Sequence, residues 1–74
     1  MKYNHFLDIK GMCCSAPVIY LTREFKSINS GEIALVESNK TSMLNDIPSY
    51  CRTTKKELLQ QEEKNGLFYF WIKK

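Results

Sequence analysis

The sequence predicts an α+β fold: a two-layer α/β sandwich with the order βαβαββ. In this fold, two helices pack on one face of a four-stranded mixed sheet. Three observations predict it: an apolar run that ends at a glycine before a helically spaced segment, a second apolar run after that segment, and an Asn-Gly pair before an aromatic strand. Each predicted helix has a single apolar stripe, so both are expected on the same side of the sheet.

The chain is expected to begin with a strand that leads into a helix. Residues 3–9 are rich in aromatic and branched side chains, and the pattern stops at Gly11. Either Ser15 or Ala16 can cap the helix that follows. Pro17 then lies in the first turn, where a missing N–H group costs nothing.

The first helix and the strand after it are predicted from their periodicity. The apolar residues that recur at helical spacing are Val18, Leu21, Phe25 and Ile28. Asn29-Ser30-Gly31 is a typical helix end. Residues 32–37 contain a continuous apolar run, as expected for a central strand. Strand, helix and strand together make a right-handed unit with parallel strands.

The second helix is expected over residues 43–53. Pro48 lies inside this segment, which is tolerated if the main helix starts near Asp46 as its cap. Ile47, Tyr50 and Cys51 then share an inward stripe.

The chain is expected to end in an antiparallel hairpin. The predicted strands are residues 56–62 and 67–72, joined at Lys64-Asn65-Gly66. In the last strand, the two sets of alternating side chains are Phe68, Phe70 and Ile72 on one face and Leu67, Tyr69 and Trp71 on the other. The second set forms either a partly covered sheet face or a surface for protein contact or self-association.

Length and charge restrict the class of protein. The 74 residues make one domain, residues 1–74, with a net charge of +3 and scattered basic residues. No apolar run approaches the ~20 residues that span a bilayer, and no signal-type segment follows Met1. We therefore expect a cytoplasmic protein, without direct nucleic-acid binding or membrane contact, that is a monomer or a weak dimer.

The three cysteines point to thiol chemistry. Their odd number in a chain expected to be cytoplasmic disfavours a disulfide framework, and Cys13, Cys14, Cys51 and His5 lack the spacing of a zinc site. Cys14 lies just before a predicted helix N-terminus, which favours a thiolate over a thiol. Cys51 is interpreted as a core residue, and no metal or cofactor is expected.

The ordered motifs resemble the TusA/SirA family of small sulfur-carrier proteins. The matching segments are Leu7-Asp8, Gly11, Cys14-Ser15-Ala16-Pro17, Gly31-Glu32, Asp46-Ile47-Pro48-Ser49-Tyr50-Cys51 and residues 66–72. The resemblance implies the βαβαββ fold and a persulfide on Cys14. It also implies a sulfur donor, such as a cysteine desulfurase, and a downstream acceptor protein, with tRNA thiolation among the destinations. Asp8, Gly11 and Pro17 are expected to shape the loop.

The sequence departs from the family pattern at two positions. Ser15 replaces the first proline of the motif, and Cys13 precedes the reactive cysteine. Cys13 could attack a persulfide on Cys14 or form a vicinal disulfide with it. Two alternatives to the sulfurtransferase-type sulfur carrier therefore stay open: a thiol redox module that uses Cys13 and Cys14, and a regulatory or protein-binding domain without chemistry.

Overall fold

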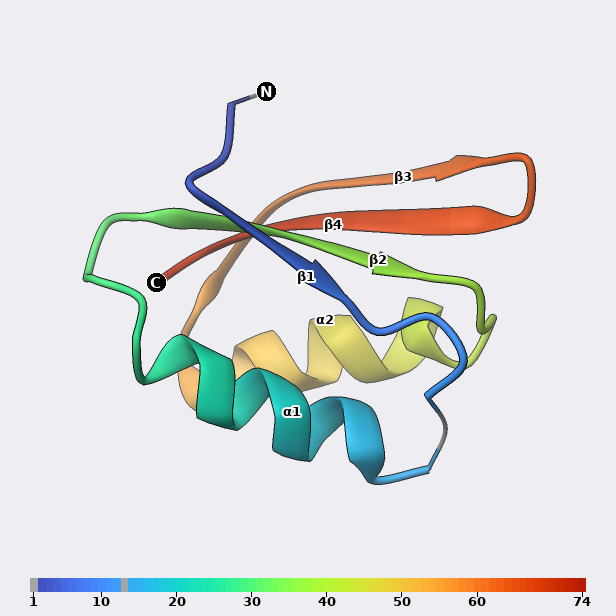
Figure 1. Cartoon of the computed structure of the whole chain (residues 1–74), viewed down its shortest axis with the longest axis horizontal. Coiled ribbons are helices and arrows are strands. Elements are labelled where there is room, and N and C mark those ends of the chain that lie inside the picture. Colours follow the sequence, from blue (N-terminus) through green and yellow to red (C-terminus); the bar gives the residue numbers. More distant parts are fainter. Residues whose placement is uncertain (1, 13) are drawn as a thin grey trace.

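A computed structural model describes residues 2–12 and 14–74, in which six elements follow the predicted order βαβαββ. Their bounds are β1 His5–Asp8, α1 Ala16–Phe25, β2 Ile33–Ser38, α2 Met43–Thr54, β3 Glu57–Lys64 and β4 Leu67–Lys73. Figure 1 shows both helices on one side of the sheet, which confirms the two-layer sandwich.

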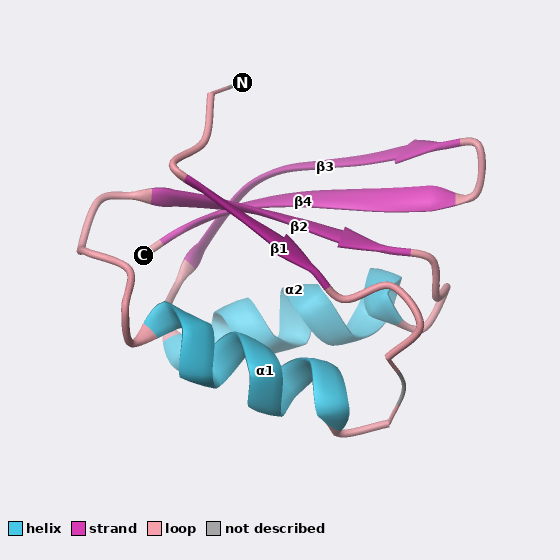
Figure 2. Cartoon of the chain, in the orientation of Figure 1, coloured by secondary structure: helices cyan, strands magenta, loops and turns pink. Residues whose placement is uncertain are grey.

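The sheet has the strand order β1-β2-β4-β3. β1 pairs with β2 in parallel, while β4 is antiparallel to both β2 and β3, so the sheet is mixed as predicted. Figure 2 shows the strands as one layer and the helices as the second. Because β1 and β2 are parallel, the loops that follow them lie at the same end of the sheet. Both helices also begin at that end (Figure 1).

The core lies between the helices and the inward side chains of the sheet. Phe68, Phe70 and Ile72 of β4 are buried there, as the alternation predicted, together with Leu21 and Phe25 of α1. Burying a large side chain of this kind contributes about 1.5–3 kcal/mol. Most of the hydrophobic stabilisation of the fold therefore comes from the contacts between the helices and this face of the sheet.

The open face of the sheet is more covered than its sequence suggests. Trp71 lies on this face, yet only 8% of it is exposed, and its ring centroid is 6.4 Å from that of Tyr69. Leu35, its neighbour on β2, is 7% exposed. Of the two interpretations, the partly covered face fits β4. The exposed aromatic residues of the described chain are instead Tyr3 and Phe6, whose rings contact one another.

Helix α1 starts after Ser15, as expected, but ends earlier than predicted. It ends at Phe25, with Lys26 as C-cap, rather than near Asn29. Hydrogen bonds between residues three apart tighten the chain over residues 26–28, so Ile28 is still buried. In the first turn, Pro17 is buried and Val18 is 40% exposed, so the inward position of Val18 was predicted wrongly.

Helix α2 starts at Met43, as expected, and ends at Thr54, one residue later than predicted. Its N-cap is Ser42, so Asp46 lies within the first turn and the prediction that Asp46 caps the helix is wrong. Pro48 is consequently inside the helix. Its missing N–H removes one hydrogen bond from the first half of α2, but the predicted buried stripe of Ile47, Tyr50 and Cys51 anchors the helix to the core.

The β3–β4 hairpin forms as predicted, with longer strands. Asn65 and Gly66 have φ angles of 53° and 79°, the left-handed values that a two-residue hairpin turn requires. The two strands pair from Glu57 opposite Lys73 to Lys64 opposite Leu67, with a shift in register between Leu58 and Gln60. Among residues 2–12 and 14–74, no helix is long and apolar enough to cross a membrane.

Candidate functional site at the start of helix α1

The loop between β1 and α1 starts with a tight turn at Gly11. The Met12 N–H donates to the carbonyl oxygen of Ile9 at 3.1 Å, and Gly11 has a φ of 81°. A turn of this type needs a positive φ at its third residue, which glycine adopts without strain. The sequence pattern thus ends β1 and turns the chain toward the helix layer.

Cys14 lies at the far end of this loop, one residue before the N-cap of α1. Its side chain is exposed, and its φ of 63° is in the left-handed region. That conformation costs a residue with a Cβ roughly 1–2 kcal/mol. Strained residues of this kind concentrate at functional sites. No sequence signal predicted the strain, although the exposed position at the helix start was expected.

The first turn of α1 is organised differently from the prediction. Ser15 occupies the N-cap position, but within the described residues its side chain makes no capping hydrogen bond. Its carbonyl oxygen instead accepts from the Ile19 N–H at 3.1 Å. Pro17 is in the first turn as expected and is buried. The backbone N–H groups of this turn therefore lack a side-chain cap from Ser15, and they lie next to Cys14.

A charged network lies at the start of the same loop. Asp8 Oδ1 accepts from the Lys10 backbone N–H at 2.9 Å, and Lys10 Nζ lies 3.2 Å from Asp8 Oδ2. Lys10 Nζ also donates to Glu37 Oε1 at 2.6 Å. The Lys10 contacts lower the pKa of Asp8, and the Glu37 carboxylate, followed by Asp8, raises the pKa of Lys10. Tyr69 is hydrogen-bonded to the buried Glu37, which raises the tyrosine pKa.

Asn39 joins the cysteine loop to the loop after β2. Its Oδ1 accepts from the Gly11 backbone N–H at 3.0 Å, across 28 positions in the sequence. The sequence reading missed Asn39, Lys10 and Glu37. The predicted parallel pairing of the first two strands could have indicated these residues, because the carboxyl ends of neighbouring parallel strands lie side by side. Asp8 and Glu37 are paired at that end of β1 and β2.

The remaining candidate residues lie elsewhere or outside the described chain. Cys51 is 3% exposed in the core, and its burial raises the pKa of its thiol. His5 is bonded to Glu32 at the opposite end of β1. Cys13 lies outside the described residues. Within residues 2–12 and 14–74, no group of three or more His, Cys, Asp or Glu side chains is arranged to hold a metal ion.

Apolar side chains surround the start of α1. Val18 and Ile19 are 40% and 61% exposed, and Leu44 in the first turn of α2 is 37% exposed. Val18 lines a shallow groove between the two helices, of about 250 Å³, with Tyr50 and polar residues of α2. The groove is open to solvent, so its shape suits contact with another macromolecule better than enclosure of a small substrate.

Comparisons with known proteins agree with this arrangement. The sequence model of the family described as "Sulfurtransferase TusA" matches residues 5–74. The chain is 31% identical to the sulfur carrier protein TusA of Buchnera aphidicola over 71 residues, which cover 96% of the chain and 90% of that relative. It is 37% identical to the sulfur carrier protein TusA of Pseudomonas putida over 68 residues, covering 92% and 85%.

The fold also has a counterpart among solved structures. The crystal structure of a SirA-like protein from Desulfitobacterium hafniense superposes with a TM-score of 0.79. It covers 95% of this chain and 96% of its own length, at 18% sequence identity, so the likeness concerns the fold. The family match spans all six elements and includes Cys14 at the start of α1. The chain belongs to the TusA sulfurtransferase family.

Proposed function

We propose that this protein is a sulfur carrier that accepts sulfane sulfur as a persulfide on Cys14 and passes it to a partner protein. The observation that carries the proposal is the exposed Cys14 at the N-terminus of α1, in a chain that matches the TusA family along residues 5–74. Related proteins of similar length are named sulfur carriers. The positive end of a helix dipole favours the thiolate, which is the reactive form.

The proposed transfer needs no oxidant and no metal. The Cys14 thiolate attacks the outer sulfur of a donor persulfide, so a new S–S bond forms at Cys14 and the S–S bond of the donor breaks. The donor cysteine leaves as a thiolate. In the second step, an acceptor thiolate attacks the outer sulfur of the Cys14 persulfide, and Cys14 leaves as a thiolate.

The surroundings of Cys14 support direct transfer between proteins. Val18 and Ile19 present apolar surface in the first turn of α1, four and five residues after Cys14, and the groove lined by Val18 continues this surface toward α2. We infer that a donor, such as a cysteine desulfurase, and a downstream acceptor bind here in turn. Thiolation of tRNA or related sulfur trafficking is the proposed destination. Exposed apolar patches of this kind are typical of protein contact sites.

Intact-mass measurement after incubation with a cysteine desulfurase and cysteine tests the proposal. Wild type, Cys13→Ser and Cys51→Ser are expected to gain one sulfur atom, which a reductant removes. Cys14→Ser is expected to gain none. Sulfur uptake by Cys14→Ser equal to that of wild type would overturn the assignment of the site.

The same variants separate the carrier from a thiol redox module. A redox module requires both Cys13 and Cys14, so Cys13→Ser would abolish activity as fully as Cys14→Ser, and the oxidised wild type would lose two hydrogens in mass. A carrier keeps sulfur uptake in Cys13→Ser. A protein-binding domain without chemistry would bind its partner equally well after both cysteines are replaced.

A further inference from the structure

Most of the basic side chains lie at one end of the molecule, where both helices end. They come from three separate segments, and they are seven of the eleven Lys and Arg residues in the chain. The seven at this end are Arg23 and Lys26 of α1 and its cap, Arg52 and Lys55 of α2 and its cap, Lys56, and Lys73 and Lys74 at the end of β4. We call this set the basic end.

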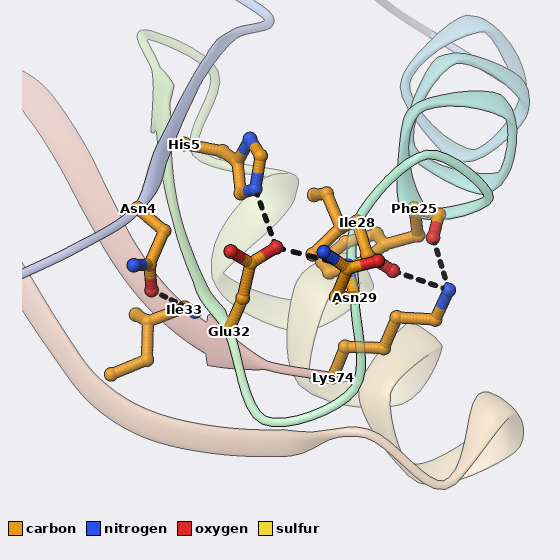
Figure 3. Close-up of polar contacts among 8 residues, drawn as sticks. All are labelled: Asn4, His5, Phe25, Ile28, Asn29, Glu32, Ile33 and Lys74. Atoms are coloured by element: carbon orange, nitrogen blue, oxygen red, sulfur yellow. Dashed lines mark hydrogen bonds and ion pairs between the residues drawn. The ribbon is translucent and has the colours of Figure 1, made fainter.

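The sheet topology brings these segments together. Lys73 pairs with Glu57 at the start of β3, directly after α2, and with Ile33 at the start of β2. The Lys74 Nζ donates to the carbonyl oxygens of Phe25 and Ile28, at 2.5 and 2.7 Å (Figure 3). Basic residues that are scattered in the sequence thus lie at the same end of the fold.

The negative groups near the basic end can neutralise only some of its seven basic side chains. The carboxylates near this end are Glu24, Glu32 and Glu57, and Glu32 is already bonded to His5. Each helix C-terminus adds roughly half a negative charge. Seven basic side chains exceed these groups, so the basic end keeps a surplus of positive charge. The rest of the chain holds four basic and five acidic residues.

A shallow cavity of about 210 Å³, as open to solvent as the groove at Val18, lies within the basic end, between the last turns of the two helices. Its walls include the side chains of Lys26, Lys56 and Lys74 together with the hydroxyl-bearing Thr22 and Thr54. The Lys56 ammonium is held over the rings of Phe25 and Tyr50, at 5.0 and 5.5 Å from their centroids. The Thr54 hydroxyl donates to the Tyr50 carbonyl oxygen at 2.7 Å, and Lys74 is bonded to backbone carbonyls. The ammonium groups of Lys26 and Lys56 are therefore the groups that suit a carboxylate here.

We propose that the basic end binds an acidic segment of a partner protein, with one carboxylate of that segment in the cavity. An acidic protein segment fits better than a nucleic acid, because the aromatic rings here, Phe25 and Tyr50, are 2% and 7% exposed and offer no surface for base stacking.

The basic end and Cys14 can be occupied together. They lie at opposite ends of α1, whose ten residues span roughly 15 Å. This separation exceeds the Debye length of about 8 Å at physiological ionic strength, so the two sites are electrostatically separate. An acidic partner would therefore hold the protein while leaving its thiol accessible to a second protein. The binding itself requires no sulfur chemistry, so the inference goes beyond the proposed function.

Fluorescence anisotropy with a labelled peptide of alternating Glu and Ser tests the inference on the full chain. The peptide is expected to bind at low ionic strength and to dissociate as salt is added. The double variant Lys26→Glu/Arg52→Glu should weaken binding by about tenfold or more, because it replaces attraction by repulsion at the site. The matched control is Lys40→Glu/Lys64→Glu, which changes the net charge equally at the other end of the molecule.

Three results would overturn the inference: no binding of the acidic peptide at low salt, equal losses in the two double variants, or tighter binding of a single-stranded RNA with the same number of charges. Circular dichroism of both variants establishes that they are folded. Sulfur uptake by Cys14 is expected to stay normal in Lys26→Glu/Arg52→Glu, so a failure here leaves the proposed carrier function testable separately.

Discussion

At the residue scale, the two cysteines in the described chain differ in their surroundings. Cys14 is exposed at a strained position before α1, whereas Cys51 is 3% exposed and packs in the core. Burial raises the pKa of the Cys51 thiol, and the nearby Lys56 opposes this only in part. Since the thiolate is the nucleophile, the burial and the raised pKa of Cys51 both disfavour reaction at that thiol, whereas Cys14 is exposed.

We therefore expect iodoacetamide to label the two thiols at different rates. The variant Cys13→Ser keeps only Cys14 and Cys51, so each label can be assigned to one thiol. In this variant, Cys14 should react at least about tenfold faster than Cys51 at neutral pH. Peptide mapping by mass spectrometry after timed quenching measures both rates. Urea should abolish the difference, and comparable labelling of Cys51 in the folded protein would contradict the burial argument.

The sequence alone predicted much of this residue-scale description. Cys14 could be placed before a helix because Gly11 and Pro17 limit the loop locally. The left-handed φ of Cys14 and the missing side-chain cap at Ser15 could not be predicted. Both depend on the path that the loop takes between a strand and a helix whose relative position the whole fold determines.

At the element scale, the loops after β1 and β2 act as one unit. The Asn39 side chain accepts from the Gly11 backbone N–H, so the β2–α2 loop holds the turn that leads to Cys14. The network of Asp8, Lys10 and Glu37 ties the ends of the same two strands together. These contacts restrict the position of the thiol-bearing loop relative to the sheet.

Removing the Asn39 amide should loosen this loop. Asn39→Ala is expected to lower the free energy of unfolding by about 0.5–1.5 kcal/mol, the usual net contribution of one hydrogen bond. Under the proposed function it should also slow sulfur uptake by Cys14, because the loop samples more conformations. Urea unfolding and timed intact-mass measurements provide the two readouts.

Asn45→Ala is the matched control, since it removes the same amide from an exposed position on α2. Its unfolding free energy should stay unchanged or rise slightly, because alanine favours a helix. If the two variants have the same stability and the same uptake rate, the Asn39 contact does not position the loop.

Element boundaries show where local patterns fail. The sequence interpretation started the main part of α2 near Asp46 to keep Pro48 in the first turn, yet the helix starts at Met43 with Ser42 as cap. The buried Met43 explains the difference, because it belongs to the core cluster and draws the first turn onto the sheet. Packing against distant residues outweighed the local preference of proline.

At the scale of the whole molecule, one end is held together by contacts between distant segments. His5 Nε2 lies 2.9 Å from Glu32 Oε1, which also accepts from the Asn29 backbone N–H at 3.0 Å (Figure 3). The backbone of Lys74 bonds to Gly31 and Glu32 at the same place. The first strand, the turn before β2 and the end of β4 thus meet at Glu32.

The pKa of Glu32 predicts an acid-dependent loss of stability. The contacts with His5 and then Asn29 lower its pKa from the ordinary value of 4.5. A carboxylate with a lowered folded pKa stabilises the fold above its unfolded pKa, and this stabilisation disappears as the pH falls through the folded value. Glu32→Gln should therefore be less stable than wild type at neutral pH, with a difference that shrinks below pH 4.5.

Thermal unfolding at several pH values measures this difference. Glu57→Gln is the control, because it removes an exposed carboxylate at the start of β3. Its effect on stability is expected to be small and to vary little over the same pH range. If the stability difference between Glu32→Gln and wild type stays constant as the pH falls below 4.5, ionisation of Glu32 does not stabilise the fold.

The sequence by itself determined the order of the elements, the inward faces of the strands and the position of Cys14 before α1. These features follow from residue periodicity and from local turn chemistry, which act over a few positions. Only the tertiary structure decided that Asn39 holds the cysteine loop, that Trp71 is covered, and that scattered lysines and arginines form the basic end. Each of these depends on contacts between residues far apart in the chain, as with Lys74 and Phe25, which are 49 positions apart.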